Sequence, residues 1–230
     1  MYRILFLAAV LPAIFLIRKI YKMDTVEKEP TGLLVSLVFL AIGSILIAMV
    51  GEWLGGTILS TFLMPDTVLY NLVYYFLVVG VSEELAKYLI LRLRTWKASA
   101  FNCRFDGVVY AVTVSLGFAL WENVAYVMQY GFTTAVLRAV TAIPGHACFG
   151  VFMGVWYGTA KHCDLYGGSK TKSLLRRAVW IPVVLHGLYD FIASLGGTLF
   201  TIAFIAYIAV LFLISWGTAK RAAQEDVYFG

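Results

Sequence analysis

The chain has 230 residues, of which 61% are hydrophobic and only 13% are charged. A soluble globular domain carries about 25% charged residues, so this composition excludes a soluble domain and predicts a polytopic membrane protein. The net charge of +5 would suit a nucleic-acid-binding protein, but the basic residues cluster between apolar segments, as in the loops of membrane proteins. We therefore expect the lipid bilayer, and no nucleic acid, as a partner.

Seven apolar segments approach the length of about 20 residues that a helix needs to cross the hydrocarbon core. They lie at roughly 2–17, 33–50, 67–91, 107–129, 138–160, 177–195 and 198–217. The first follows one basic residue and precedes several, an order that favours an uncleaved anchor over a secretory signal. Segment 52–67 is polar and rich in glycine, and we expect an outer loop or an interfacial turn there. The pattern predicts an all-α transmembrane bundle that forms one membrane domain over residues 1–230.

The loops between these segments alternate in charge. Those at 18–32, 92–106 and 161–176, like the C-terminal tail, contain several Lys and Arg residues, whereas those at 51–66, 130–137 and 196–197 contain none. Basic loops remain on the cytoplasmic side of a membrane. Seven spans with the N-terminus outside and the C-terminus in the cytoplasm satisfy every loop.

Charged and imidazole side chains interrupt the apolar spans between residues 67 and 195. They are Glu83, Glu84, Lys87, Glu122, His146, His186 and Asp190, with Asn123 next to Glu122. A charge at the centre of a membrane helix costs roughly 2.5–3.5 kcal/mol, so these groups must contact one another or water. A rise of about 1.5 Å per residue places the carboxylates and histidines in one slab near the bilayer midplane, on four different helices, with Lys87 shallower.

Helical spacing pairs several of these residues. Residues four apart share one face of a helix, and the pairs with this spacing are Glu83 with Lys87, Phe118 with Glu122, and His186 with Asp190. Pro144 removes a backbone hydrogen bond close to His146, a break that membrane helices tolerate where neighbouring helices or water satisfy the freed carbonyl. Farther along, Gly150, Gly154 and Gly158 form a stripe of small residues that lets another helix approach closely.

Each polar pair also has a plain structural interpretation: an ion pair for Lys87 with Glu83, an interhelical hydrogen bond for Glu122 with Asn123, and a helix clamp for His186 with Asp190. A membrane scaffold would use the whole cluster only for packing. A proton- or ion-coupled transporter also places carboxylates at the midplane, but transporters often contain two related halves, and here the polar residues occupy one contiguous block. Two histidines and four carboxylates at one depth favour an active site.

Four motifs in this block resemble those of the PrsW family of intramembrane proteases. They are EELAK (83–87), FALWEN (118–123), an isolated histidine (His146) and HGLYD (186–190). Together they match the pattern EExxK, FxxxE, His and HxxxD, in that order and on four successive helices. The family is distantly similar to the CAAX prenyl proteases and to bacteriocin-processing enzymes, whose motifs differ. The resemblance covers roughly residues 80–191.

The resemblance implies an endopeptidase that hydrolyses a peptide bond within or beside the cell membrane of a bacterium. Its implied substrate is a single-span anti-sigma factor, which receives its first cut there. The catalytic residues are then expected to be Glu83, Glu84, Glu122, His146, His186 and Asp190, supported by Lys87, Asn123 and Phe118. The catalytic core covers about residues 67–195.

Two mechanisms remain open, and both use an attacking water, because no serine or cysteine has an obvious histidine partner. In the first, which needs no metal, Glu84 acts as the general base and Glu83 pairs with Lys87; the reverse assignment of the two glutamates is nearly as well supported. The two histidines then stabilise the oxyanion or carry protons, and Asp190 orients the second of them.

In the second mechanism, His146, His186 and a carboxylate, either Asp190 or Glu122, hold Zn²⁺. Three protein ligands and a water are the usual arrangement of a catalytic zinc site, and the ion lowers the pKa of that water. The sequence contains no HExxH motif, which slightly favours the glutamate mechanism.

Overall fold

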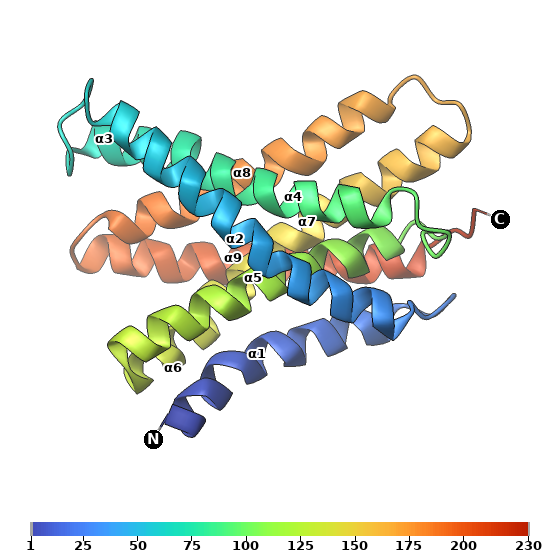
Figure 1. Cartoon of the computed structure of the whole chain (residues 1–230), viewed down its shortest axis with the longest axis horizontal. Helices are drawn as coiled ribbons and strands as arrows, with labels where there is room; N and C mark the ends of the chain where they lie inside the picture. Colours follow the sequence, from blue (N-terminus) through green and yellow to red (C-terminus); the bar gives the residue numbers. More distant parts are fainter. Residues whose placement is uncertain (1, 230) are drawn as a thin grey trace.

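The computed structural model describes residues 2–229, which fold into a bundle of long helices (Figure 1). The helices are α1 (Tyr2–Met23), α2 (Thr31–Leu59), α3 (Val68–Val73), the π-helix η1 (Tyr74–Gly80), α4 (Val81–Thr95), α5 (Asp106–Tyr130), α6 (Phe132–Val140), α7 (Ala142–Leu165), α8 (Thr171–Ser194) and α9 (Thr198–Gln224). Because α3, η1 and α4 follow one another without a break, and only Thr141 separates α6 from α7, the described chain contains seven continuous helical segments. The predicted all-α bundle is confirmed.

Six of these segments are long and apolar enough to cross a membrane. They are α1, α2, α3 with η1 and α4, α5, α6 with α7, and α9. The remaining helix, α8, has 24 residues, which is enough length, but Arg176, Arg177, His186 and Asp190 make it more polar. The predicted multi-pass membrane protein is confirmed, whereas α8, which carries the HGLYD motif, is not among the six segments apolar enough to span.

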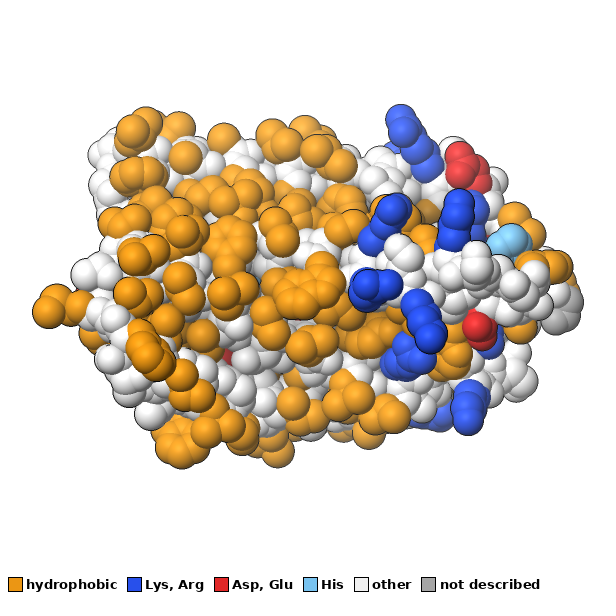
Figure 2. All heavy atoms as spheres, turned by 90° about the horizontal axis from the view of Figure 1, so that it is seen from above, with side chains coloured by type: hydrophobic (Ala, Val, Ile, Leu, Met, Phe, Trp, Pro, Cys, Tyr) orange, Lys and Arg blue, Asp and Glu red, His pale blue; other side chains and the backbone are white. Residues whose placement is uncertain are grey.

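The outer surface has the character of a membrane protein. Figure 2 shows a face covered by apolar side chains, with Lys and Arg gathered at the end that also holds the C-terminus in Figure 1. Phe39, Leu46 and Leu213 are 62%, 63% and 71% exposed, and apolar surface of this extent suits contact with lipid. We call the end that carries the loops 96–105 and 166–170 the basic end; the positive-inside rule predicts that it faces the cytoplasm.

The glycine-rich stretch after residue 51 is helical, so the outer loop expected at 52–67 is wrong over its first half. α2 continues to Leu59, and the turn covers residues 60–67. The glycines serve a helix contact: a Cβ added to Gly51 would lie 2.5 Å from Oγ of Ser82, and one added to Gly55 would lie 2.7 Å from Cγ1 of Val78. α2 therefore packs tightly against η1 and α4.

The helix break near His146 lies at Thr141, between α6 and α7, and not at Pro144 as expected. Residues 132–137, expected in an outer loop, belong to α6. Pro144 is the third residue of α7, a position whose backbone N–H has no partner within the helix, so proline costs little there. The break allows α7 to start next to the polar residues of α5.

The predicted stripe of small residues is confirmed as a packing surface between α7 and α5. A Cβ added to Gly150 would lie 2.9 Å from the Cα of Val112, and the other two glycines of the stripe also face backbone atoms. Ser115 of α5 donates a hydrogen bond of 2.7 Å to the carbonyl oxygen of His146. This close packing fixes the height of His146 relative to α5.

α8 approaches η1 equally closely at two glycines. A Cβ added to Gly80 would lie 3.0 Å from the carbonyl oxygen of Val183, and one added to Gly187 would lie 2.8 Å from the Cα of Phe76. Single π-helical turns are rare and frequently occur at functional sites, and η1 ends directly before the EELAK motif. The contact brings His186, the neighbour of Gly187, beside α4.

Candidate functional site

Lys87 lies at the centre of the polar side chains of α4, α5, α7 and α8. Its Nζ is 2.9 Å from Oε2 of Glu83, 2.8 Å from Oε1 of Glu84 and 3.2 Å from Nδ1 of His146. Lys87 and Glu84 are completely buried. The ammonium also lies 4.1 Å from the centroid of the Phe118 ring, which is a cation–π contact. The pair of Lys87 with Glu83 is thus present, and one cation balances two glutamates.

His186 joins this group from α8. Its Nδ1 lies 2.8 Å from Oε1 of Glu84 and 3.9 Å from Oε2 of Glu83, and its Nε2 lies 3.3 Å from Oδ2 of Asp190. Phe149 stacks on the imidazole, with the ring centroids 4.8 Å apart. Carboxylates on both ring nitrogens and an aromatic neighbour therefore fix the orientation of His186.

His146 connects the centre to α5 and α6. Its Nε2 lies 3.1 Å from Oε2 of Glu122, and Nη2 of Arg138 donates to the same oxygen at 2.8 Å. Nε of Arg138 donates to Oδ1 of Asn123 at 2.9 Å, and Nδ2 of Asn123 donates to the carbonyl oxygen of Ala9 at 2.8 Å. Asn123 therefore supports the site through Arg138 and links it to α1.

The hydrogen bonds determine which nitrogen of each imidazole carries a proton. An ammonium group can only donate, so Nδ1 of His146 accepts from Lys87, and its Nε2 carries the proton that Glu122 accepts. An ionised carboxylate can only accept, so Nδ1 of His186 donates to Glu84. His146 therefore presents a lone pair to the centre of the cluster.

A cavity of about 330 Å³ adjoins these residues. Five of the predicted catalytic residues line it: Glu83, Glu122, His146, His186 and Asp190. Glu84 is completely buried behind this wall, beside Lys87. The structure therefore brings all six predicted catalytic residues together, but it separates the two adjacent glutamates into one that faces the cavity and one that lies beneath it.

Two further charged residues line the cavity, and neither is predicted from the sequence as a site residue. Glu52 lies near the end of α2, in a segment expected to be a loop, and Arg138 lies in α6, at the edge of an expected span. Arg138 could have been recognised from the sequence, because it is a basic residue directly after an outer loop, 130–137, that contains no Lys or Arg. Four tyrosines also line the cavity: Tyr74, Tyr75, Tyr126 and Tyr189.

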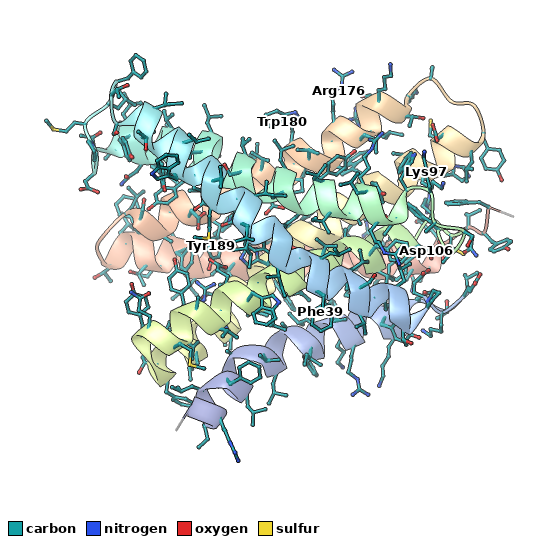
Figure 3. The ribbon with its side chains drawn as sticks, in the orientation of Figure 1. Phe39, Lys97, Asp106, Arg176, Trp180 and Tyr189 are labelled. Carbon is teal, nitrogen blue, oxygen red and sulfur yellow. The ribbon has the colours of Figure 1, made fainter. Side chains whose placement is uncertain are left out.

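The cavity lies on the side of the cluster that is turned away from the basic end. Figure 3 shows Tyr189 in the half of the bundle opposite to Lys97, which belongs to a basic loop. If the basic end faces the cytoplasm, as the positive-inside rule predicts, the cavity lies in the outer half of the membrane.

Four residues offer atoms close enough to hold one metal ion. Glu83, Glu84, His146 and His186 each contribute a nitrogen or oxygen, and these atoms all lie within 4.8 Å of one another. Oε2 of Glu84 is buried without a hydrogen-bond partner among the described residues, which leaves a carboxylate oxygen available as a ligand. Imidazole nitrogen and carboxylate oxygen are usual ligands of zinc, so this set fits a divalent metal.

The two carboxylates that the sequence suggested as metal ligands, Glu122 and Asp190, do not belong to this set of four residues. Glu122 and Asp190 contact the outer nitrogens, Nε2 of His146 and Nε2 of His186. Metal-binding histidines usually donate their other N–H group to a carboxylate, so this arrangement also fits a metal at the inner nitrogens. In the structure the cation at the centre is the Lys87 ammonium, which contacts three of the four candidate ligands.

Known proteins have sequences similar to this one. The sequence model of the PrsW family intramembrane metalloproteases matches residues 29–216. Curated proteins with similar sequences include Protease PrsW from Oceanobacillus iheyensis, 30% identical over 96% of both chains, and Protease PrsW from Shouchella clausii, 32% identical over 97% of this chain and 99% of that one. Protease PrsW from Bacillus subtilis is 27% identical over 95% of this chain and 93% of that one. No solved structure matches the chain.

Proposed function

Since the chain belongs to the PrsW family of intramembrane metalloproteases, we propose that it cleaves a single-span membrane protein at the cavity beside Glu83, His146 and His186. The chain is an intramembrane protease of a bacterial membrane. The observation that carries the proposal is the cavity itself: two imidazoles and four carboxylates from five helices line one space among membrane spans. Polar side chains that served packing alone would be expected to fill the space between the helices and not to line a cavity.

We assign the role of general base to Glu83. Its carboxylate lines the cavity, whereas Glu84 is completely buried, so Glu83 is the glutamate that an attacking water meets. This is the reverse of the assignment preferred from sequence. Glu83 takes a proton from the water as it attacks the peptide carbonyl and passes that proton to the leaving amine. Lys87, 2.9 Å away, holds the carboxylate in position.

The negative charge that develops on the peptide oxygen needs donors in the cavity. Arg138 lines the cavity and uses Nη2 and Nε for Glu122 and Asn123. A guanidinium has five N–H groups, so Arg138 retains donors for the oxyanion. We propose this stabilising role for Arg138.

Two versions of the chemistry use the same residues. Glu83, Glu84, His146 and His186 would hold a divalent metal such as Zn²⁺, which when bound supplies polarisation of the peptide carbonyl and a water of lowered pKa. Glu122 and Asp190 then hold the imidazoles in place through their outer nitrogens. The versions differ in whether the Lys87 ammonium or a metal ion balances the two glutamates.

The substrate that we propose is a single-span anti-sigma factor, because the family resemblance implies it. The cavity lies away from the basic end, so we expect the cut in the outer half of the substrate's membrane segment. Nothing in the lining residues specifies a side chain of the substrate.

The proposal is tested by reconstituting the purified protein in vesicles with a single-span reporter. Wild-type protein is expected to cleave the reporter, and Glu83→Gln to lose cleavage while inserting in equal amount. Glu225→Gln, whose side chain is 71% exposed at the basic end, is the matched control and should cleave normally. Unchanged cleavage by Glu83→Gln would falsify the proposed base, ion flux without cleavage by wild type would indicate a transporter, and loss of the protein itself would indicate a structural role.

A further inference from the structure

A second group of carboxylates lies at the basic end, outside the cavity. Asp24 and Glu29 belong to the linker between α1 and α2, and Asp106 is the first residue of α5. Each offers an oxygen within 4.8 Å of the others, and the residues are only 1%, 3% and 0% exposed. Figure 3 places Asp106 toward the opposite end of the bundle from Tyr189, which lines the cavity. We call these three residues the acidic trio.

The fold holds two members of the trio in fixed positions. Oδ2 of Asp106 accepts from the backbone N–H groups of Asn102 and Cys103, at 3.0 and 2.6 Å. Oε2 of Glu29 accepts from the hydroxyl of Tyr110, one turn along α5. The spacing of these two carboxylates is therefore set by the backbone and by a buried aromatic side chain, as in a preformed site.

Three side-chain oxygens of the trio lack a hydrogen-bond partner in the described chain. Both side-chain oxygens of Asp24 and Oδ1 of Asp106 are buried without a hydrogen-bond partner in the described chain, and so is Oδ1 of Asn102. The neighbouring ammonium of Lys28 donates to the backbone carbonyls of Tyr21 and Asp24. Among residues 2–229, no Lys or Arg forms an ion pair with the trio. A buried charge without a partner is strongly unfavourable.

The carboxylate of Asp226, in the C-terminal tail, lies near enough to Asp24 to add negative charge to this region, and the Lys28 ammonium partly offsets it. Oδ2 of Asp226 is itself buried without a partner in the part of the chain that the structure describes. Two arrangements relieve this concentration of negative charge: a proton shared within the trio, or a bound cation. The two have different consequences for a neutral substitution.

We propose that the acidic trio binds a hard divalent cation of the Mg²⁺ and Ca²⁺ class. These cations prefer oxygen ligands such as carboxylates, and the trio offers only carboxylate oxygens. The mixed set of nitrogens and oxygens at the cavity suits a metal such as zinc. The two sites therefore differ in ligand chemistry as well as in position.

A cation at the trio would join three parts of the chain at the basic end. The linker supplies Asp24 and Glu29, and α5 supplies Asp106. The loop before α5 also holds the C-terminal tail: the N–H of Arg104 donates to the carbonyl of Val227 at 3.1 Å, and the N–H of Phe229 donates to that of Asn102 at 2.7 Å. The cation acts as a structural clamp for this end, so its effect appears in stability.

The test uses the full-length protein in detergent, stripped with EDTA and titrated with MgCl₂ or CaCl₂ while thermal unfolding is followed. Wild type is expected to melt about 2–4 °C higher when the site is filled, the shift for a modest gain in stability in a chain of this size. Asp24→Asn is expected to bind at least an order of magnitude more weakly, because it removes ligand charge. In EDTA it should melt higher than wild type, because it removes an unpaired buried charge.

Two controls separate the trio from other sites. Asp164→Asn, at an exposed residue in the last turn of α7 at the same end, should respond to the cations as wild type does. His146→Ala should also respond, because His146 belongs to the cavity. No response of wild type to either cation at millimolar concentration, with Asp24→Asn more stable under all conditions, would replace the cation by a shared proton. A full response from Asp24→Asn would equally overturn the proposal.

Discussion

His186 and Glu84 are 102 positions apart in the chain, yet Nδ1 of His186 lies 2.8 Å from Oε1 of Glu84, and both residues are buried. The same glutamate oxygen accepts from Lys87 at 2.8 Å. Glu84 therefore fastens α8 to α4 from beneath the cavity, while its neighbour Glu83 faces the cavity. We therefore expect the two adjacent glutamates to have different roles, and substitution of each one alone can distinguish these roles.

Glu84→Gln is expected to lower both stability and activity. A glutamine has nearly the same shape, but its neutral oxygen poorly balances Lys87 and His186, and removing one partner of a buried ion pair costs about 3–5 kcal/mol. Glu83→Gln should lose cleavage with a much smaller effect on stability, because its carboxylate lines a cavity. Thermal unfolding and reporter cleavage measured on both variants check this contrast. Equal stability losses for the two would contradict the division of roles.

Arg138→Lys is expected to reduce kcat/KM by about 10–100-fold, the usual cost of losing an outer partner of an active-site group. Arg138 contacts Glu122 and Asn123 with two different nitrogens, and a lysine ammonium cannot reproduce this fork. Steady-state cleavage of the reporter measures the change. Arg176→Gln, a substitution in an exposed stretch of α8, serves as the control for lost positive charge. Full activity of Arg138→Lys would show that charge alone suffices.

Metal content distinguishes the two versions of the chemistry. If the donor set of the cavity holds a metal, the purified protein should contain about one ion of the zinc class per chain, apart from any Mg²⁺ or Ca²⁺ at the acidic trio, and a chelator should remove both that ion and the cleavage. His186→Ala should then lose the ion. The third histidine, His162, lies at the basic end beside Tyr166, and His162→Ala should retain it. Cleavage that persists in protein shown to be free of metal would leave the Lys87 ammonium as the cation that balances Glu83 and Glu84.

The main features of the site could be predicted from sequence because a membrane makes buried charge expensive. That cost identifies Glu83, Lys87 and His186 within apolar spans, and helical spacing assigns the first two to one face. The glycine stripe that begins at Gly150 could be predicted from the sequence for a related reason, because close helix packing in lipid depends on small residues.

The rest of the site depends on contacts between packed helices, and these contacts leave no recognisable pattern in the sequence. Adjacent helical residues point about 100° apart, so the sequence shows that Glu83 and Glu84 differ but not which one meets the cavity; the approach of α8 decides this. Glu52 was assigned to a loop because its neighbouring glycines look like turn residues, although they pack against Ser82 and Val78. The acidic trio lies in a linker and at a helix end, where charged residues are ordinary and do not attract notice.

Gly187→Ala is expected to reduce cleavage without touching a polar group. The added Cβ would lie 2.8 Å from the Cα of Phe76 and equally close to its ring, and a backbone atom in a packed helix cannot move aside. α8 would have to shift away from η1, at a cost of about 1–3 kcal/mol. His186 directly precedes Gly187, so it would move with α8. A displacement of about 1 Å at a catalytic group costs on the order of 10²-fold in rate.

Gly217→Ala is the matched control for this substitution. It lies in α9, and a Cβ there would meet nothing within 4 Å, so the variant should cleave normally and be slightly more stable, since alanine favours helix over glycine by about 1 kcal/mol. Reporter cleavage and thermal unfolding, measured in the same detergent, compare the two variants. If Gly187→Ala retained wild-type cleavage, the close contact between α8 and η1 would not be what positions His186.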